Sequence, residues 1–95
     1  MESKIIPLPG YGLTTIDTEI EDKAYDTPQT GTLLRLTKED SEKVFDKIDG
    51  TTYGDLIGKK IYWAKYSDAD GTFYDDDINQ KVVLISLEKL RGYKK

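Results

Sequence analysis

The residues whose types could support chemistry gather in an acidic stretch between residues 66 and 77. Asp68–Gly71 ends in an Asp-Gly pair, and Asp75–Asp77 places three carboxylates in a row. A calcium loop of the EF-hand type needs acidic residues at positions one, three and five, Gly at six and Glu at twelve. If Gly71 takes position six, Tyr66 falls at position one, and the flanks have the composition of strands. We therefore interpret the stretch as a solvated hairpin tip. Weak binding of a divalent cation by Asp75–Asp77 stays open, although neighbouring carboxylates on a strand point to opposite faces.

The composition removes much of the usual catalytic and metal-binding repertoire. The 95 residues include no Cys and no His. This excludes disulfides, zinc or iron sites with nitrogen and sulfur ligands, and His-based catalysis. With 18 acidic residues, chance carboxylate pairs are near certain, so no glycosidase-like pair can be singled out. The sequence favours a protein that is not an enzyme and holds no cofactor or metal.

Charge and hydropathy set the expected environment. The chain has 14 basic residues against 18 acidic ones and a net charge of −4, whereas a nucleic-acid partner needs a basic face. No stretch is long and apolar enough to span a bilayer, and the N-terminal residues lack the apolar centre of a signal peptide. We expect neither a nucleic-acid partner nor a membrane, and we expect a cytoplasmic location.

Short runs of β-branched and aromatic residues predict an all-β fold in one domain spanning residues 1–95. Ile61–Tyr66 and Thr72–Tyr74 flank the Asp-Gly pair and predict a hairpin. Tyr62, Trp63 and Tyr66 fit core and edge packing better than a sugar-binding or protein-binding face. The other candidates are an edge strand or bend at Ile5–Leu8, strands at Leu13–Ile16 and Gly31–Leu36, and a strand buried on both faces at Lys81–Ser86.

One short helix is predicted between residues 37 and 50. Thr37–Asp40 resembles a capping box, and Val44, Phe45 and Ile48 follow at the spacing of one helix face. Asp49–Gly50 then supplies a stop.

Near the C-terminus, Leu87 and Leu90 are three residues apart and precede Gly92. This spacing favours a single helical turn over a last strand. About five or six short strands with one short helix fit a small barrel or sandwich.

The segment from Asp17 to Thr30 has the composition of an exposed, mobile loop. It reads DTEIEDKAYDTPQT, and its apolar residues are Ile20, Ala24 and Tyr25. A loop of this length in so small a domain is more often functional than idle. We therefore expect it to bind a partner.

The order of these segments resembles the small co-chaperonins of the GroES type. That family opens with a short I-x-P-L strand, matched by Ile5–Leu8, and continues through a second strand to a mobile loop, matched by residues 17–30. A strand that opens with Gly follows, matched by Gly31–Leu36. Ile57–Lys59 loosely matches the later V-G-D motif, and Val83–Ile85 matches an apolar strand near the end. The resemblance covers nearly the whole chain in order and length.

The resemblance implies a partly closed, GroES-like β-barrel that assembles into a ring, typically heptameric, through its N- and C-terminal strands. In the family, the ring caps a chaperonin cylinder, and a hydrophobic tripeptide of the loop docks between helices of that cylinder. Burying two side chains such as Ile20 and Tyr25 supplies about 3–6 kcal/mol per loop before the ordering entropy is subtracted, and several loops add by avidity. The implied partner-binding residues are Ile20, Ala24 and Tyr25, and the implied oligomer interface comprises Ile5, Ile6, Leu8, Leu87 and Leu90.

The composition of the loop motivates an alternative function. It contains no tripeptide of the I-V-L type. The alternative hypothesis is therefore a virion structural protein or capsid decoration protein of a bacteriophage, with capsid proteins as partners and the virion as its location. Both hypotheses predict a non-enzymatic protein that binds other proteins, and the first predicts a homo-oligomer.

Overall fold

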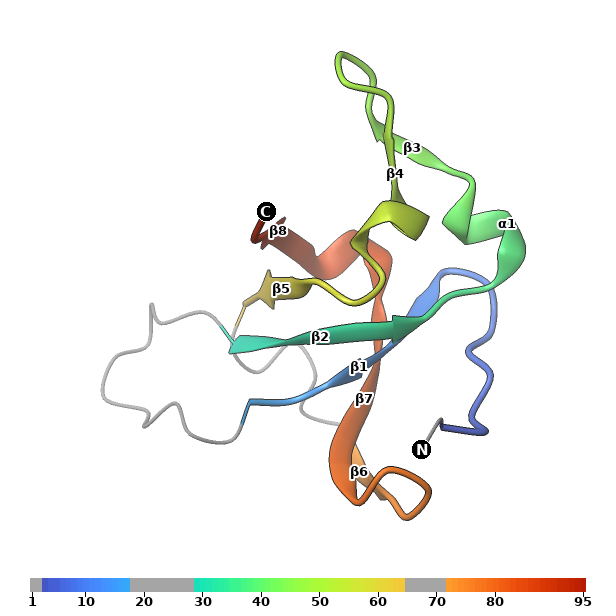
Figure 1. Ribbon diagram of the computed structural model, residues 1–95, viewed down its shortest axis with the longest axis vertical. Coiled ribbons are helices and arrows are strands. Elements are labelled where there is room, and N and C mark those ends of the chain that lie inside the picture. Colours follow the sequence, from blue (N-terminus) through green and yellow to red (C-terminus); the bar gives the residue numbers. More distant parts are fainter. Residues whose placement is uncertain (1–2, 18–28, 65–71) are drawn as a thin grey trace.

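The computed structural model describes residues 3–17, 29–64 and 72–95, and these residues fold mainly into β-strands (Figure 1). The all-β class is therefore confirmed. The elements in chain order are β1 (Tyr11–Thr15), β2 (Gln29–Arg35), α1 (Lys38–Ser41), β3 (Val44–Asp46), β4 (Thr51–Thr52), the 3-10 turn η1 (Tyr53–Leu56), β5 (Lys60–Trp63), β6 (Thr72–Asp75), β7 (Gln80–Ser86), the 3-10 turn η2 (Leu87–Lys89) and β8 (Leu90–Tyr93).

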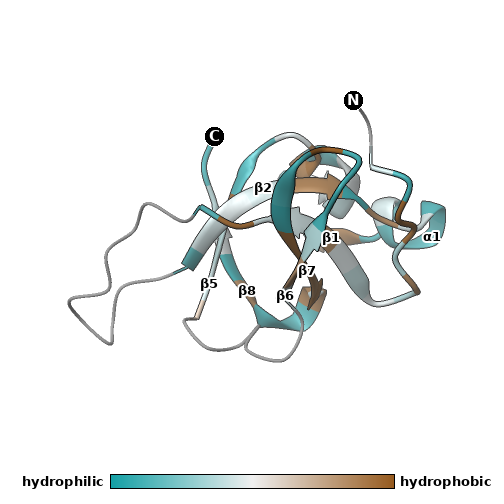
Figure 2. Ribbon diagram, turned by 90° about the horizontal axis from the view of Figure 1, so that it is seen from below, coloured by the Kyte–Doolittle hydropathy of each residue, from teal (hydrophilic) through white to brown (hydrophobic). Residues whose placement is uncertain are grey.

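Six strands form one antiparallel sheet in the order β6-β7-β1-β2-β5-β8. β6 and β8 are its edges, so in the described part of the chain the sheet does not close into a barrel by hydrogen bonding. β3 and β4 form a separate two-stranded ribbon, which projects from the rest of the molecule (Figure 1). Figure 2 shows hydrophobic stretches within the strands of the sheet.

The core is built from the inward faces of the central strands and the two 3-10 turns. Its buried residues are Leu33, Leu36, Leu56, Ile61, Trp63, Val83, Ile85 and Leu87. Trp63 is fully buried, which agrees with its expected packing role. Val82 and Val83 are consecutive and both fully buried, which confirms that this strand is covered on both faces.

The predicted hairpin between Ile61–Tyr66 and Thr72–Tyr74 is wrong in its pairing. β5 pairs with β2 and β8, whereas β6 pairs with β7 from Thr72↔Val83 to Asp75↔Gln80. The tight turn lies between β6 and β7, where Asn79 takes a left-handed conformation with φ of 54°, one that Asn tolerates better than most residues. The Asp-Gly pair itself lies outside the described residues.

The predicted helix is also misplaced. α1 ends at Ser41, and Val44 and Phe45 belong to β3. The Phe45 ring packs against the rings of Tyr53 and Tyr93, at centroid distances of 5.1 and 5.7 Å. This aromatic contact reaches across to β8, and the segment is paired as a strand with β4.

The helix cap itself is partly as predicted. The Thr37 hydroxyl accepts a hydrogen bond from the Asp40 N–H at 3.1 Å, which is one half of a capping box. The Asp40 side chain bonds elsewhere, to Gly10 and Lys43.

Three further elements differ in detail from the expected ones: the N-terminal segment, the start of β2 and the C-terminal turn. Ile5–Leu8 forms no strand, and β2 begins at Gln29, inside the predicted loop. The expected turn at Leu87 is present as η2, but it leads into β8, so a turn and a last strand both occur.

Candidate functional site

The segment expected to bind a partner leaves and re-enters the sheet between neighbouring strands. Ile20, Ala24 and Tyr25 lie outside the described residues, but both ends of the segment are described. The Asp17 N–H donates to the Thr30 carbonyl at 2.9 Å, and the Thr30 hydroxyl donates to Asp17 Oδ2 at 2.6 Å. These bonds extend the β1–β2 pairing and tie the two ends together.

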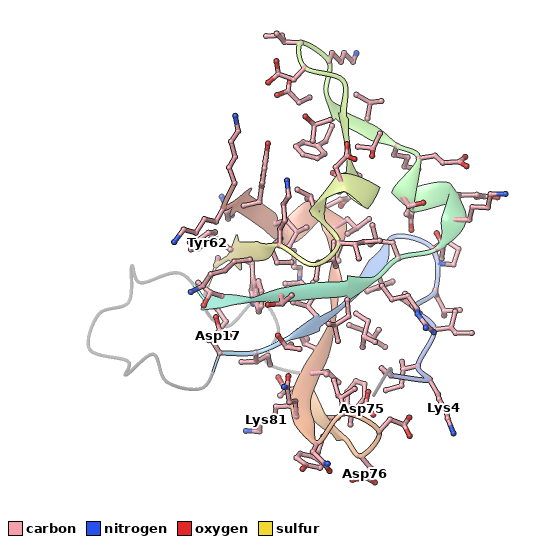
Figure 3. The ribbon with its side chains drawn as sticks, in the orientation of Figure 1. Lys4, Asp17, Tyr62, Asp75, Asp76 and Lys81 are labelled. Atoms are coloured by element: carbon pink, nitrogen blue, oxygen red, sulfur yellow. The ribbon has the colours of Figure 1, made fainter. Side chains whose placement is uncertain are left out.

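Further contacts fix Asp17 at this base (Figure 3). The Gln29 Nε2 group donates to the Asp17 carbonyl at 3.2 Å, and Lys60 Nζ lies 3.7 Å from Asp17 Oδ2. Both Asp17 and Lys60 are partly exposed, so this ion pair contributes little stability. The base is therefore held mainly by hydrogen bonds between β1 and β2.

Gly31 makes the close approach of β1 and β2 possible beneath this base. A Cβ atom at Gly31 would overlap the Thr15 carbonyl oxygen and would lie 2.7 Å from the Thr15 carbonyl carbon and 3.0 Å from Trp63 Cη2. The position therefore requires glycine because of the neighbouring backbone. The base of the 17–30 segment rests on a tightly packed part of the core.

The N-terminal segment, residues 3–10, presents two apolar side chains to solvent. Ile6 and Leu8 are each 73% exposed, whereas Pro7 between them is buried. Ile5 is half-buried. Of the residues predicted at the oligomer interface, Ile6 and Leu8 are therefore accessible, and Ile5 is partly covered.

Carboxylates anchor this segment at both of its ends. Buried Asp75 of β6 accepts a hydrogen bond from the Ser3 hydroxyl, and Asp77 accepts one from the Lys4 N–H at 3.3 Å. Figure 3 shows Lys4 and Asp75 at the same end of the molecule. At the other end, Asp40 Oδ2 accepts from the Gly10 N–H at 2.7 Å.

Asp40 is a buried charge whose partners keep it ionised. The hydrogen bond from Gly10 is the main cause that lowers its pKa, and Lys43, with Nζ at 3.1 Å from Oδ1, adds to the effect. Burial opposes the shift because it penalises the charged form. The net result is a pKa below the usual value for Asp.

The two C-terminal residues expected at an oligomer interface, Leu87 and Leu90, differ in burial. Leu87 is 7% exposed and belongs to the core, so we remove it from the predicted surface. Leu90 is half-buried and packs against the core at the start of β8. On one side β8 pairs with β5, and no described strand pairs with its other side.

Asp75 and Asp77, at the β6–β7 turn, accept hydrogen bonds from groups of the protein itself. Asp75 Oδ1 accepts from the Asp77 N–H at 2.9 Å, and both carboxylates also bond the N-terminal segment. In the described ranges, no group of three or more acidic side chains is placed to hold a metal ion. This geometry gives no support to the divalent-cation site that the sequence left open.

Sequence reasoning missed the anchoring roles of Asp40, Asp75 and Ser3. The signal for Asp40 was present as its position in the capping motif, which keeps the side chain near the chain that precedes the helix. Nothing local marks Asp75, because its partner Ser3 lies at the other end of the sequence.

No protein-family model and no curated protein matches this chain. Among the described residues, no helix has the length and apolar character needed to cross a membrane.

Proposed function

We propose that this protein is a non-enzymatic, co-chaperonin-like subunit that binds a protein partner through its 17–30 segment and associates with copies of itself. The observation that carries the proposal is the paired base of that segment. Residues 18–28 connect two adjacent antiparallel strands, where two to five residues would be enough. The Asp17–Thr30 bonds hold both ends of this long connection against the core.

The order of elements supports the family reading. The long connection between β1 and β2 agrees with the expected loop, and β8 agrees with the expected C-terminal strand. Ile5–Leu8 departs from the expected order, because it forms no strand. On this proposal, Ile6 and Leu8 of one copy contact the free edge of β8 and Leu90 in the next. The two surfaces lie at different places on one subunit, so the contact is heterologous and can close into a ring.

Two measurements test the proposal, and the first is the mass in solution. Light scattering at several concentrations should give a ring-sized species. Ile6→Asp with Leu8→Asp should reduce it to monomers, because two charges would enter an apolar contact. Ile48→Asp is the matched control, since Ile48 is 95% exposed in the separate ribbon. A wild-type protein that stays monomeric on concentration would refute the ring.

The second measurement is binding to a chaperonin in the presence of ATP. Wild type and Ile48→Asp should be retained by an immobilised chaperonin, and Ile20→Asp should be lost because a charge replaces an apolar anchor. Equal retention of wild type and both variants, or no retention of wild type, would contradict partner binding through the 17–30 segment.

The second candidate is a bacteriophage virion or capsid decoration protein. The absence of an I-V-L type tripeptide in the 17–30 segment favours it. It predicts a monomer that binds assembled capsids and ignores a chaperonin. The co-chaperonin-like function would place the protein in the cytoplasm, and this one would place it in the virion.

A further inference from the structure

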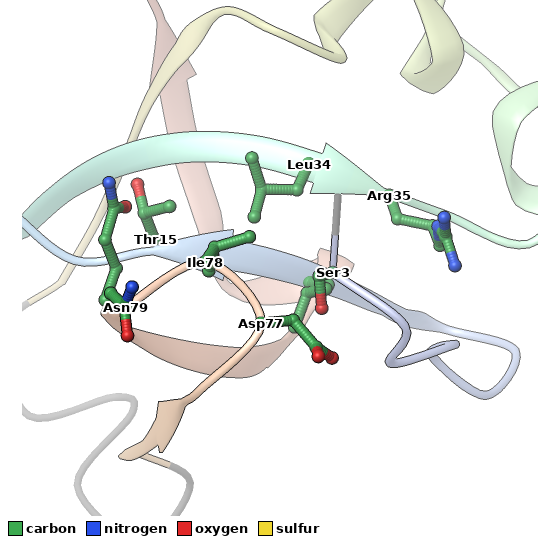
Figure 4. Close-up of a pocket in the computed structure, with 9 residues that line it drawn as sticks. Ser3, Thr15, Leu34, Arg35, Asp77, Ile78 and Asn79 are labelled. Carbon is green, nitrogen blue, oxygen red and sulfur yellow. The ribbon is translucent and has the colours of Figure 1, made fainter. Parts of the chain in front are cut away.

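The outer face of the sheet carries a groove that neither candidate function uses. It has a volume of about 450 Å³ and lies between strands β1 and β2, the β6–β7 turn and the start of the described chain (Figure 4). This volume falls in the range of small-molecule sites. Leu13, Leu34 and Ile78 supply its apolar lining.

Two opposite charges line the same groove without neutralising one another. Arg35 donates from Nη1 to the Ile5 carbonyl at 3.4 Å, and among the described residues no acidic side chain forms an ion pair with it. Asp77 accepts the Lys4 N–H at 3.3 Å through one oxygen, Oδ2. Figure 4 shows Arg35, Ser3 and Asp77 toward one end of the groove, Thr15 and Asn79 toward the other, and Leu34 and Ile78 between them.

These groups define the chemistry of a ligand. Most of the five N–H donors of Arg35 remain available, and a guanidinium group pairs with a carboxylate through two parallel hydrogen bonds. A ligand with a carboxylate alone would be repelled by Asp77, and a ligand with an ammonium group alone would be repelled by Arg35. A ligand that carries both charges, on two groups attached to one carbon atom, can pair with both side chains.

We propose that this groove binds a free α-amino acid with an apolar side chain. Its carboxylate pairs with Arg35, its ammonium group pairs with Asp77, and its side chain contacts Leu34 and Ile78. The half-buried position of Arg35 and Asp77 strengthens both pairs relative to fully exposed ones. This inference goes beyond the proposed function, because the described lining of the groove includes neither Ile6 and Leu8 nor any residue of β8.

Amide NMR titrations with three ligands of similar shape test the proposal. Leucine carries both charges, leucinamide lacks the carboxylate, and isocaproate lacks the ammonium group. Saturable shifts should appear at Leu34, Ile78 and their neighbours. Leucine should bind about tenfold more tightly than either analogue, which corresponds to one charged hydrogen-bonded contact. No saturable shift, or equal binding of the three ligands, would overturn the proposal.

Variants that each remove one charge test whether Arg35 binds the carboxylate and Asp77 binds the ammonium group. Arg35→Gln should abolish the preference for leucine over leucinamide and keep the preference over isocaproate. Asp77→Asn should do the reverse, while its amide oxygen can still accept the Lys4 N–H. The controls are Arg91→Gln and Asp76→Asn, which make the same charge changes at exposed positions. The proposal is wrong if each variant behaves like its control, and the same spectra establish that every variant is folded.

Discussion

Replacing Gly31 with alanine should destabilise the protein more than any other single methyl addition to its described glycines. The new Cβ would overlap the Thr15 carbonyl oxygen and approach the Trp63 ring at 3.0 Å. A rotamer change cannot relieve the first contact because it involves backbone, so β1 and β2 must separate. Overpacking typically costs about 1–3 kcal/mol, and we expect about 3 kcal/mol or more because β1–β2 hydrogen bonds are lost as well.

Gly92→Ala is the matched control, because a Cβ atom there has nothing within 4 Å. Its free energy of unfolding should stay within about 0.5 kcal/mol of wild type. For a domain of this size, a loss of about 3 kcal/mol lowers the melting temperature by roughly 12–24 °C. Urea unfolding followed by the fluorescence of buried Trp63 measures both variants. If Gly31→Ala unfolds at the same urea concentration as Gly92→Ala, the close packing of β1 on β2 is refuted.

Three further predictions concern the cap, the ribbon and the buried carboxylate. Thr37→Ala removes the acceptor for the Asp40 N–H and should cost about 1 kcal/mol in urea unfolding; no change would mean that the cap is dispensable. Ile48→Ser should be neutral within about 0.5 kcal/mol, whereas Leu56→Ala should cost about 2–5 kcal/mol, since the two residues are 95% and 4% exposed. A large loss of stability on replacing Ile48 would instead favour the helix that the spacing of Val44, Phe45 and Ile48 predicted. The pKa of Asp40 is lowered in the folded state, so its contribution is complete above the unfolded value of about 4 and disappears as pH falls through the folded pKa. Asp40→Asn should therefore weaken the pH dependence of stability below about pH 4, and an unchanged acid profile would count against a charged Asp40.

The sequence predicted the strands better than their pairing. β2, β5 and β7 are rich in apolar and β-branched residues, a property that can be recognised from neighbouring residues alone. Pairing depends on residues far apart in the chain. β6 follows an Asp-Gly pair but bonds forward to β7, because the turn at Asn79 brings those two strands together.

The region of β3 and β4 shows how a correct local signal can mislead. Thr37 does cap a helix, and the spacing of Val44, Phe45 and Ile48 fits a continuation of that helix. In the structure Val44 and Phe45 instead lie in β3, which pairs with β4, and the Phe45 ring contacts Tyr93 of the last strand. Tertiary packing commonly overrides helix propensity in this way.

The sequence indicated where the two candidate contact segments lie, but it did not indicate which hydrogen bonds hold them to the rest of the fold. The polar composition of residues 17–30 indicated an exposed connection, and Pro7 indicated a non-helical N-terminus. The acceptors of the N-terminal segment could not be predicted, because acidic residues such as Asp75 ordinarily face solvent. Asp75 is instead 3% exposed, with the Ser3 hydroxyl as its donor.

One backbone amide in each region has a different kind of acceptor, and this difference has a measurable consequence. The Asp17 N–H donates to a backbone carbonyl, that of Thr30, whereas the Gly10 N–H donates to the carboxylate of Asp40. Carboxylates lose acceptor strength when protonated, and backbone carbonyls do not titrate. The Gly10 end of the N-terminal segment should therefore open locally in acid before the sheet does. Hydrogen exchange of the Gly10 amide, relative to the intrinsic rate at each pH, should accelerate below about pH 4, while the Asp17 amide stays protected. Parallel loss of protection at both amides would show that the segment and the sheet unfold as one unit.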